Sequence, residues 1–186
     1  MGKVLQEDII PQTTSSLTRI REYKVVKANS LIQKSQHNLS VQEQKIVLYL
    51  ITKIKPGDQT IKECEFSIRE FCQIVGIDYT NGGNYTNLKA TIKKLADKSF
   101  WIDVDDQETL FRWIARPYIN KKTGTILLKL DEPMKPYLLQ LKEQFTQYSL
   151  YYTLAMKSKY SISLYEILKS YENLHGWEFE VDELKE

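Results

Sequence analysis

The chain has 186 residues, of which 42% are hydrophobic and 27% charged, enough apolar side chain for one good-sized domain or two small ones. No segment approaches the roughly 20 consecutive apolar residues of a membrane span, and the N-terminus lacks the apolar core of a secretory signal. We therefore expect a soluble, cytoplasmic protein with no membrane contact. The formal net charge of +2 is too small to indicate nucleic-acid binding by itself, so any basic surface must be local.

The first segment with a folding signal begins near Tyr23. Residues 1–22 combine Pro11 with a polar run and show no sustained hydrophobic period, which predicts a flexible tail. Residues 23–27 then have the composition of a strand, and residues 28–33 add a short helical turn.

A long helix is expected next. Ser40 and Glu43 form the S-x-x-E pattern of a capping box, which starts a helix, and Pro56 predicts that it ends near Lys55. Four apolar side chains fall together at helical spacing and predict one buried face: Val47, Leu50, Ile51 and Ile54.

A strand and a short helix follow. Residues 64–68 alternate in polarity as a strand does, and Ser67 with Glu70 repeats the capping-box pattern before a helix over residues 68–75. Gly76 suits the end of that helix, because glycine adopts the left-handed conformation of a C-terminal cap without strain.

The third helix carries a candidate DNA-binding face. It is expected over residues 84–98, with Leu88, Ile92 and Leu95 as its buried stripe. Lysines neutralise phosphates, and Asn or Thr side chains reach base edges. The face opposite the buried stripe carries these residue types beside the small Ala90. The DNA-binding candidates on it are Thr86, Asn87, Lys89, Lys93 and Lys94. A face that is merely exposed to solvent would have the same residue types.

Strands dominate the next part of the chain. Residues 100–104, 110–119 and 125–130 are rich in strand-forming residues, and Lys121 and Lys122 occupy the last turn between them. Helix, strand, helix, helix and β-ribbon is the order of a winged helix-turn-helix domain, in which the last helix reads DNA and the ribbon tip touches the DNA backbone. The predicted fold class is therefore α+β, of the winged helix-turn-helix type, with both lysines as phosphate contacts.

Two segments of the chain recur in the same order. Residues 48–53 are echoed by 164–169, and residues 66–71 by 179–184, which indicates a duplicated unit. We predict one whole winged helix over residues 23–147 and the truncated beginning of a second over residues 148–186. Lys157 and Lys159 precede the helix of the second copy, where a helix N-terminus also favours phosphate, and are further DNA-binding candidates. Tyr49 and Tyr165 occupy equivalent points of the echo and are expected to be core residues.

Three motifs carry a family resemblance: NSL at residues 29–31, QKIVLYL at 44–50, and S-x-Y-S-I-x-L-Y-E-x-L-K-x-Y at 158–171. With them the chain resembles the Rep_3 family of plasmid replication initiators over roughly residues 23–186. The resemblance implies two winged helices, binding to repeated double-stranded origin DNA, and a homodimer that represses its own gene. It also implies origin opening with host replication factors, and main base-specific contacts from the second winged helix. We therefore expect this chain to discriminate poorly among DNA sequences.

No pattern of enzymatic chemistry accompanies these motifs. His37 and His175 lie far apart in the sequence, and Cys64 and Cys72 do not resemble zinc ligands or a disulfide framework, so we expect no metal and no cofactor. Gly82 and Gly83 lack the lysine and spacing of a nucleotide-binding loop.

Three functions compete at this point: a replication initiator, a nicking enzyme and a winged-helix repressor or partner-binding module. A nicking enzyme needs a tyrosine nucleophile beside a metal held by clustered histidines, and that cluster is missing. A repressor would share the basic helix and wing, and only the family resemblance favours the initiator, which binds DNA without cutting it.

Overall fold

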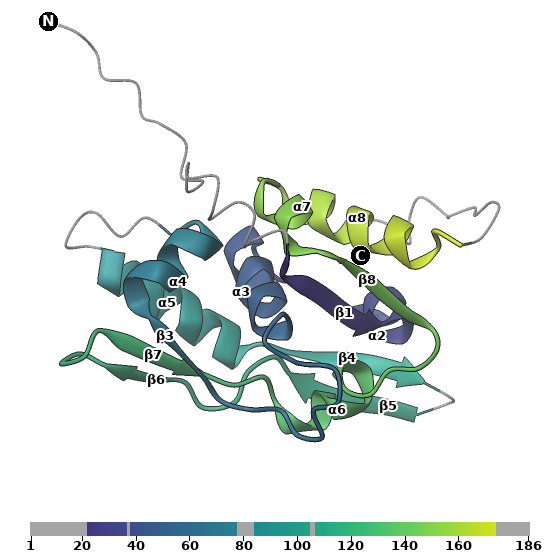
Figure 1. Cartoon of the computed structure of the whole chain (residues 1–186), viewed down its shortest axis with the longest axis horizontal. Helices are drawn as coiled ribbons and strands as arrows, with labels where there is room; N and C mark the ends of the chain where they lie inside the picture. Colours follow the sequence, from purple (N-terminus) through teal and green to yellow (C-terminus); the bar gives the residue numbers. More distant parts are fainter. Residues whose placement is uncertain (1–21, 37, 78–83, 105–106, 174–186) are drawn as a thin grey trace, which may run out of the picture.

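The computed structural model describes residues 22–36, 38–77, 84–104 and 107–173 (Figure 1). The predicted N-terminal tail lies outside these ranges except for Glu22. The helices are α2 (Asn29–Gln33), α3 (Val41–Ile51), α4 (Ile68–Val75), α5 (Asn84–Asp97), η1 (Glu132–Met134), α6 (Lys135–Leu138), α7 (Leu150–Leu154) and α8 (Lys159–Ser170). The strands are β1 (Lys24–Ala28), β2 (Ser35–Gln36), β3 (Cys64–Ser67), β4 (Ser99–Val104), β5 (Gln107–Arg112), β6 (Tyr118–Asn120), β7 (Thr125–Leu128) and β8 (Phe145–Ser149).

The described strands form three small antiparallel sheets, ordered β1-β8, β2-β4-β5 and β3-β7-β6. In Figure 1 the hairpins β4–β5 and β6–β7 lie below helices α3, α4 and α5, whereas β1 and β8 lie beside α8. Because β3 pairs with β7, the β6–β7 hairpin is attached directly to the segment that begins α4. This is the arrangement of a wing beside a helix-turn-helix.

The strand predicted over residues 110–119 is in fact two strands of different sheets. β5 ends at Arg112 in the β2-β4-β5 sheet, and β6 begins at Tyr118 in the β3-β7-β6 sheet. Between them Ile114 makes only an isolated bridge to Leu130, and Pro117 has no backbone N–H to donate to a ladder. The prediction of one strand is therefore wrong. Composition alone did not show that the chain leaves one sheet and enters another between β5 and β6.

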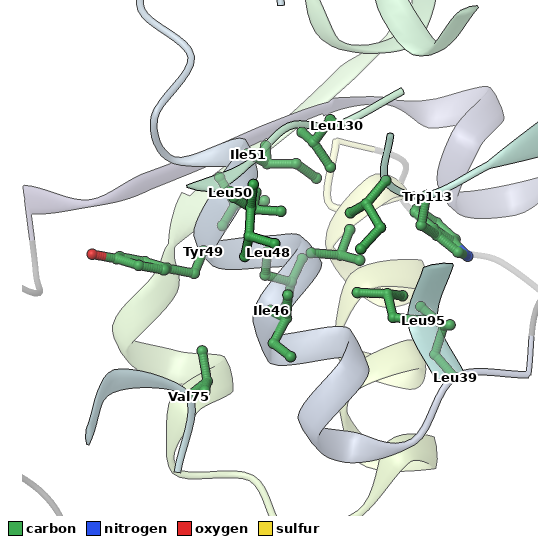
Figure 2. Close-up of a cluster of buried hydrophobic side chains, with 14 of the residues drawn as sticks. Leu39, Ile46, Leu48, Tyr49, Leu50, Ile51, Val75, Leu95, Trp113 and Leu130 are labelled. Carbon is green, nitrogen blue, oxygen red and sulfur yellow. The ribbon is translucent and has the colours of Figure 1, made fainter. Parts of the chain in front are cut away.

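Helix α3 lies at the centre of the core. Every residue from Glu43 to Ile51 is buried, because β1, α4, α5, α7 and α8 all contact the helix. Figure 2 shows Ile46, Leu48 and Ile51 of α3 pointing in different directions among the surrounding side chains. The prediction of a single buried face is therefore wrong: a helix covered on all sides needs no polar face.

The two ends of α3 differ in how well the sequence predicts them. The capping box is confirmed, because the Ser40 N–H donates to Glu43 Oε2 at 2.6 Å and the Glu43 N–H donates to Ser40 Oγ at 3.3 Å. The predicted end near Lys55 is too late. The helix ends at Ile51 and continues as tight turns, in which the Lys53 N–H donates to the Leu50 carbonyl at 3.0 Å.

The helix-turn-helix consists of α4 and α5. The predicted Ser67–Glu70 capping box is wrong, because the Ser67 side chain makes no capping hydrogen bond. The first amide of α4, that of Ile68, instead donates to the carbonyl of Gly124 in the wing at 2.9 Å. At the other end Gly76 has φ 73°, and its N–H donates to the Cys72 carbonyl, which confirms the C-terminal cap.

An order of elements repeats across the described chain. Strand β1 runs directly into the short helix α2, which the two-residue strand β2 separates from α3, and strand β8 runs directly into the short helix α7 and then α8. The two strands pair antiparallel, with Val26 opposite Gln147. The boundary predicted between residues 147 and 148 thus falls inside β8, and the division into two domains stays a prediction.

In the ranges that the structure describes, no helix is long and apolar enough to cross a membrane.

Candidate nucleic-acid interface

The predicted register of α5 is confirmed by the burial of its side chains. Leu88, Ile92 and Leu95 are buried, and Lys93 and Lys94 are exposed. The remaining members of the predicted face are exposed as well: Thr86, Asn87, Lys89 and Ala90. One side of the helix therefore packs on the core, and the other presents three lysines and two short polar side chains to solvent.

The charged side chains on this face interact only weakly with partners within the chain. Lys93 forms an ion pair with Asp97, one turn further along α5, and both side chains are largely exposed. Such a pair contributes about 0–1 kcal/mol, so a phosphate can compete for the lysine at little cost. The Thr91 hydroxyl donates to the Asn87 carbonyl at 2.9 Å and leaves the amide side chain of Asn87 outside that bond.

The wing tip lies at the N-terminal end of α5. Lys121 and Lys122 are exposed in the turn between β6 and β7. The Lys121 ammonium lies 5.9 Å from the ring centroid of Tyr85, the second residue of α5. The structure thus brings together the predicted helix face and the predicted wing lysines, which are separated by more than twenty residues in the chain.

Of the other two predicted lysines, Lys159 is linked to the opposite end of α5. Lys159 Nζ donates to Asn38 Oδ1 at 2.7 Å, and Lys98 Nζ donates to the Asn38 carbonyl at 2.6 Å. Since Lys98 directly follows the last residue of α5, Asn38 connects the start of α8 with the C-terminal end of α5. Lys157, two residues before Lys159, is exposed. Lys159 is half-buried and already has Asn38 as a partner.

Lys45 adds a buried positive charge beside this region. Burial lowers the pKa of Lys45, and the charge of Lys157 lowers it further. The Lys45 ammonium donates to the Leu154 carbonyl at the end of α7, at 2.6 Å. Lys45 thus adds a positive charge at the end of α7, shortly before Lys157 and Lys159 in the chain.

Sequence reasoning missed four residues that shape this surface: Asn38, Tyr85, Lys98 and Asn120. Lys98 was placed in the helix, but its pairing with Glu43 across the fold was not foreseeable from local patterns. Asn120 had a usable signal, because an asparagine directly before a turn commonly accepts hydrogen bonds from the turn's own amides.

Metal-binding residues do not gather in the described part of the chain: no group of three or more His, Cys, Asp or Glu side chains comes together there. His37 and His175 lie outside the described residues. Cys64 and Cys72 are free thiols, and burial raises the pKa of Cys72 to about 11, so that thiol stays protonated at neutral pH.

With this geometry established, the chain can be compared with known proteins. Residues 24–169 match the family model Rep3_N, described as "Initiator Replication protein, WH1". The chain belongs to this family of replication initiators. Membership confirms the predicted family and the α+β winged-helix fold.

Two solved structures resemble this family member. A crystal structure of the Pi initiator protein in complex with iteron DNA has a TM-score of 0.64 and 19% sequence identity, covering 89% of this chain and 72% of that one. The crystal structure of the MSBI1.176 WH1 domain, a replication protein isolated from a multiple sclerosis patient, has a TM-score of 0.38 and 17% identity, covering 53% of this chain and 79% of that one. The first likeness supports the fold.

Proposed function

We propose that this replication initiator binds repeated double-stranded origin DNA through the exposed face of α5 and the wing tip. The observation that carries the proposal is the register of α5, which buries Leu88, Ile92 and Leu95 and leaves three lysines facing solvent. The Pi initiator, a protein of the same fold, forms a complex with iteron DNA.

The dimensions of α5 suit this role. Its 14 residues make a rod about 21 Å long, and an α-helix fits the major groove of B-DNA. Recognition helices contact base edges mainly with their N-terminal residues, which here include Thr86 and Asn87. Lys89, Lys93 and Lys94 then reach phosphates, while Lys121 and Lys122 reach the backbone beside the N-terminal end.

The lysines at the start of α8 are assigned a secondary role. Lys157 is exposed, whereas Lys159 must leave Asn38 before it can reach a phosphate. We assign Lys157 to backbone contact and expect a smaller contribution from Lys159.

We further infer that residues 148–186 open a second winged helix. The support is the order of a strand, a short helix and a long helix, found in β1, α2 and α3, with the two-residue strand β2 before α3, and again in β8, α7 and α8. Leu164 of α8 is exposed although Leu48, its counterpart in the sequence echo, is buried. The described elements therefore leave an apolar side chain of α8 uncovered at that point.

Binding without strand cleavage is part of the proposal. The full sequence contains two histidines, far apart, and so lacks the clustered histidine ligands of a metal-dependent nicking site. Origin opening would then depend on binding energy and on host replication factors in the cytoplasm, where plasmid DNA replicates.

We also propose that two copies of the chain pair through β5. Among the described strands β5 pairs with β4 alone, and Trp101 and Leu110, opposite each other on this hairpin, are each 52% exposed. An antiparallel pairing of two β5 strands centred on Leu110 would place Glu108 opposite Arg112 of the second copy, twice. Such a self-complementary edge is what a two-fold dimer requires.

The test of DNA binding is a titration of duplex origin repeats over a salt series between about 50 and 200 mM. The double variant Lys93→Ala, Lys94→Ala should bind more weakly, and its slope of log affinity against log salt should fall by about 1.8, because each lost phosphate contact removes about 0.9. The matched control replaces Lys55 and Lys62, exposed lysines between α3 and β3, and should keep the parent slope. Unchanged binding by the α5 variant would exclude α5 as the contact surface.

A further inference from the structure

Two side-chain contacts hold the turn that carries the wing lysines: a hydrogen bond between the hydroxyls of Thr123 and Thr125 at 2.8 Å, and the closure of the turn by Asn120. The Asn120 Oδ1 accepts hydrogen bonds from the backbone N–H groups of Lys122, at 3.0 Å, and Thr123, at 3.3 Å. Asparagine readily closes such turns, because its short carboxamide reaches amides two and three residues ahead. Asn120 is half-buried, so its side chain is held at the base of the tip and does not project from it.

The far side of the same turn is held by the backbone. Gly124 has φ 66°, a left-handed conformation that glycine adopts without strain, and its carbonyl accepts from the Ile68 N–H at the start of α4 at 2.9 Å. Thr125 lies opposite Asn120 on β6 and opposite Ser67 on β3. The base of the tip is thus fixed to the helix-turn-helix, and only residues 121–123 depend on Asn120 for their conformation.

We propose that Asn120 is a positioning residue for DNA binding: by closing the turn, it holds the backbone of Lys121 and Lys122 in the orientation that presents both ammonium groups to phosphates beside α5. This inference rests on the proposed function. A lysine side chain is flexible, so its ammonium samples a region around its own backbone, and the position of the backbone sets which phosphates lie within that region. Without the two hydrogen bonds from the Lys122 and Thr123 amides, the tip samples many conformations in which the ammonium groups do not reach the phosphates, so these phosphate contacts are lost.

The contact between Lys121 and Tyr85 supports the same orientation. With the turn closed, the Lys121 ammonium lies over the ring of Tyr85, at the end of α5 where we place the base-reading residues Thr86 and Asn87. The closed turn therefore aligns the wing charge with the start of the reading helix.

The experiment compares four chains in the same salt series with duplex origin repeats: the parent, Asn120→Ala, the double variant Lys121→Ala, Lys122→Ala, and the triple variant that combines them. We expect the double variant to lower the slope of log affinity against log salt by about 1.8, for two phosphate contacts at about 0.9 each. Asn120→Ala alone should reproduce most of that decrease. In the triple variant the loss of Asn120 should have no further effect.

Two further variants separate positioning from other roles. Asn120→Ser keeps an oxygen acceptor at the base of the turn and should retain most of the parent slope, even if the alanine variant loses its hairpin. Asn120→Gln keeps the amide group but is too long to close the same turn, and should resemble the alanine variant. A direct contact of Asn120 with a base would instead leave the salt slope unchanged.

The outcomes that overturn the inference differ from those that overturn DNA binding by the wing. If the lysine double variant lowers the slope but Asn120→Ala does not, Asn120 is no positioning residue. An equal loss on removing Asn120 from the parent and from the lysine double variant would contradict it as well. If the lysine double variant itself binds like the parent, the proposed wing contact fails, and the role of Asn120 fails with it.

Discussion

Lys27 on β1 and Glu166 on α8 form a buried ion pair, with Lys27 Nζ 2.6 Å from Glu166 Oε1 and the two side chains only 4% and 9% exposed. The hydroxyl of Tyr148 on β8 donates a hydrogen bond to the same carboxylate oxygen. Strand β1 therefore meets β8 and α8, which lie more than a hundred residues further along the chain, at one charge cluster. The pair ties α8 to the β1-β8 sheet, at the junction between the two predicted units.

Replacing one member of this pair should destabilise the fold strongly. Lys27→Met leaves the Glu166 carboxylate buried without its cation, and breaking a buried pair in this way costs about 3–5 kcal/mol. The measurement is urea unfolding at neutral pH. As the control, Asp97→Ala breaks the exposed pair with Lys93 and should change the free energy of unfolding by at most about 1 kcal/mol.

The double variant Lys27→Met, Glu166→Leu tests the same ion pair by removing both of its charges. Because it removes both charges, it should be more stable than the Lys27→Met single variant. A single variant that unfolds at the parent's urea concentration would show that the pair does not hold α8 to the sheet.

The carboxyl of Glu43 should make stability depend on pH in the acid range. Burial raises its pKa, but hydrogen bonds from Lys98 and Ser40 and the charge of Lys98 outweigh burial and hold the pKa below the ordinary value of 4.5. A lowered folded-state pKa stabilises the fold above the ordinary value, and that contribution is lost as pH falls through the lowered value. Glu43→Gln should therefore be less stable than the parent at pH 7, with a gap that narrows in acid.

The check is urea unfolding of the two chains at a series of pH values from neutral into the acid range. A gap of constant size at every pH would show that the ionisation of Glu43 does not contribute to stability, and that its hydrogen bonds alone do.

Two similar motifs show what the sequence could and could not predict. The Ser40–Glu43 pattern formed its capping box because all of its atoms lie within one helical turn. The Ser67–Glu70 pattern has the same spacing but formed no box, and the first amide of its helix, that of Ile68, bonds to Gly124, a residue that the fold brings from the wing. Local patterns therefore predicted element starts, and tertiary contacts decided the exceptions.

The same distinction applies to the candidate site. The stripe of Leu88, Ile92 and Leu95 followed from helical periodicity alone, so the exposed face of α5 could be listed in advance. The link from Lys159 through Asn38 to Lys98 could not be, since it joins residues more than a hundred positions apart. The full burial of α3 likewise depends on five neighbouring elements.

Strand cleavage should be absent. Supercoiled origin plasmid incubated with the chain and Mg²⁺ or Mn²⁺ should remain supercoiled, because the sequence supplies no clustered histidines to hold a metal beside a tyrosine. Agarose gels read the outcome, with a commercial nicking enzyme as the positive control. Reproducible nicking that disappears when a single tyrosine is replaced would establish an enzyme.

If two copies of the chain pair along β5, reversing the charges of Glu108 and Arg112 should first weaken and then restore the dimer. In the proposed dimer Glu108 faces Arg112 of the second copy, so Glu108→Arg places like charges opposite each other at two points and should shift the chain toward monomer. Adding Arg112→Glu reverses both partners, restores two opposite-charge pairs and should recover the dimer. Because Glu108 and Arg112 are both exposed, neither change disturbs the core.

Sedimentation velocity over a range of protein concentrations measures both steps of this cycle. Leu110→Glu gives an independent check, since it places two carboxylates against each other at the centre of the proposed interface and should leave monomer at concentrations where the parent is dimeric. Thr123→Glu, on the exposed wing tip, is the matched control and should sediment like the parent. If the parent is monomeric throughout, or if the charge-swapped chain fails to recover the dimer, then the edge of β5 is not the contact between copies.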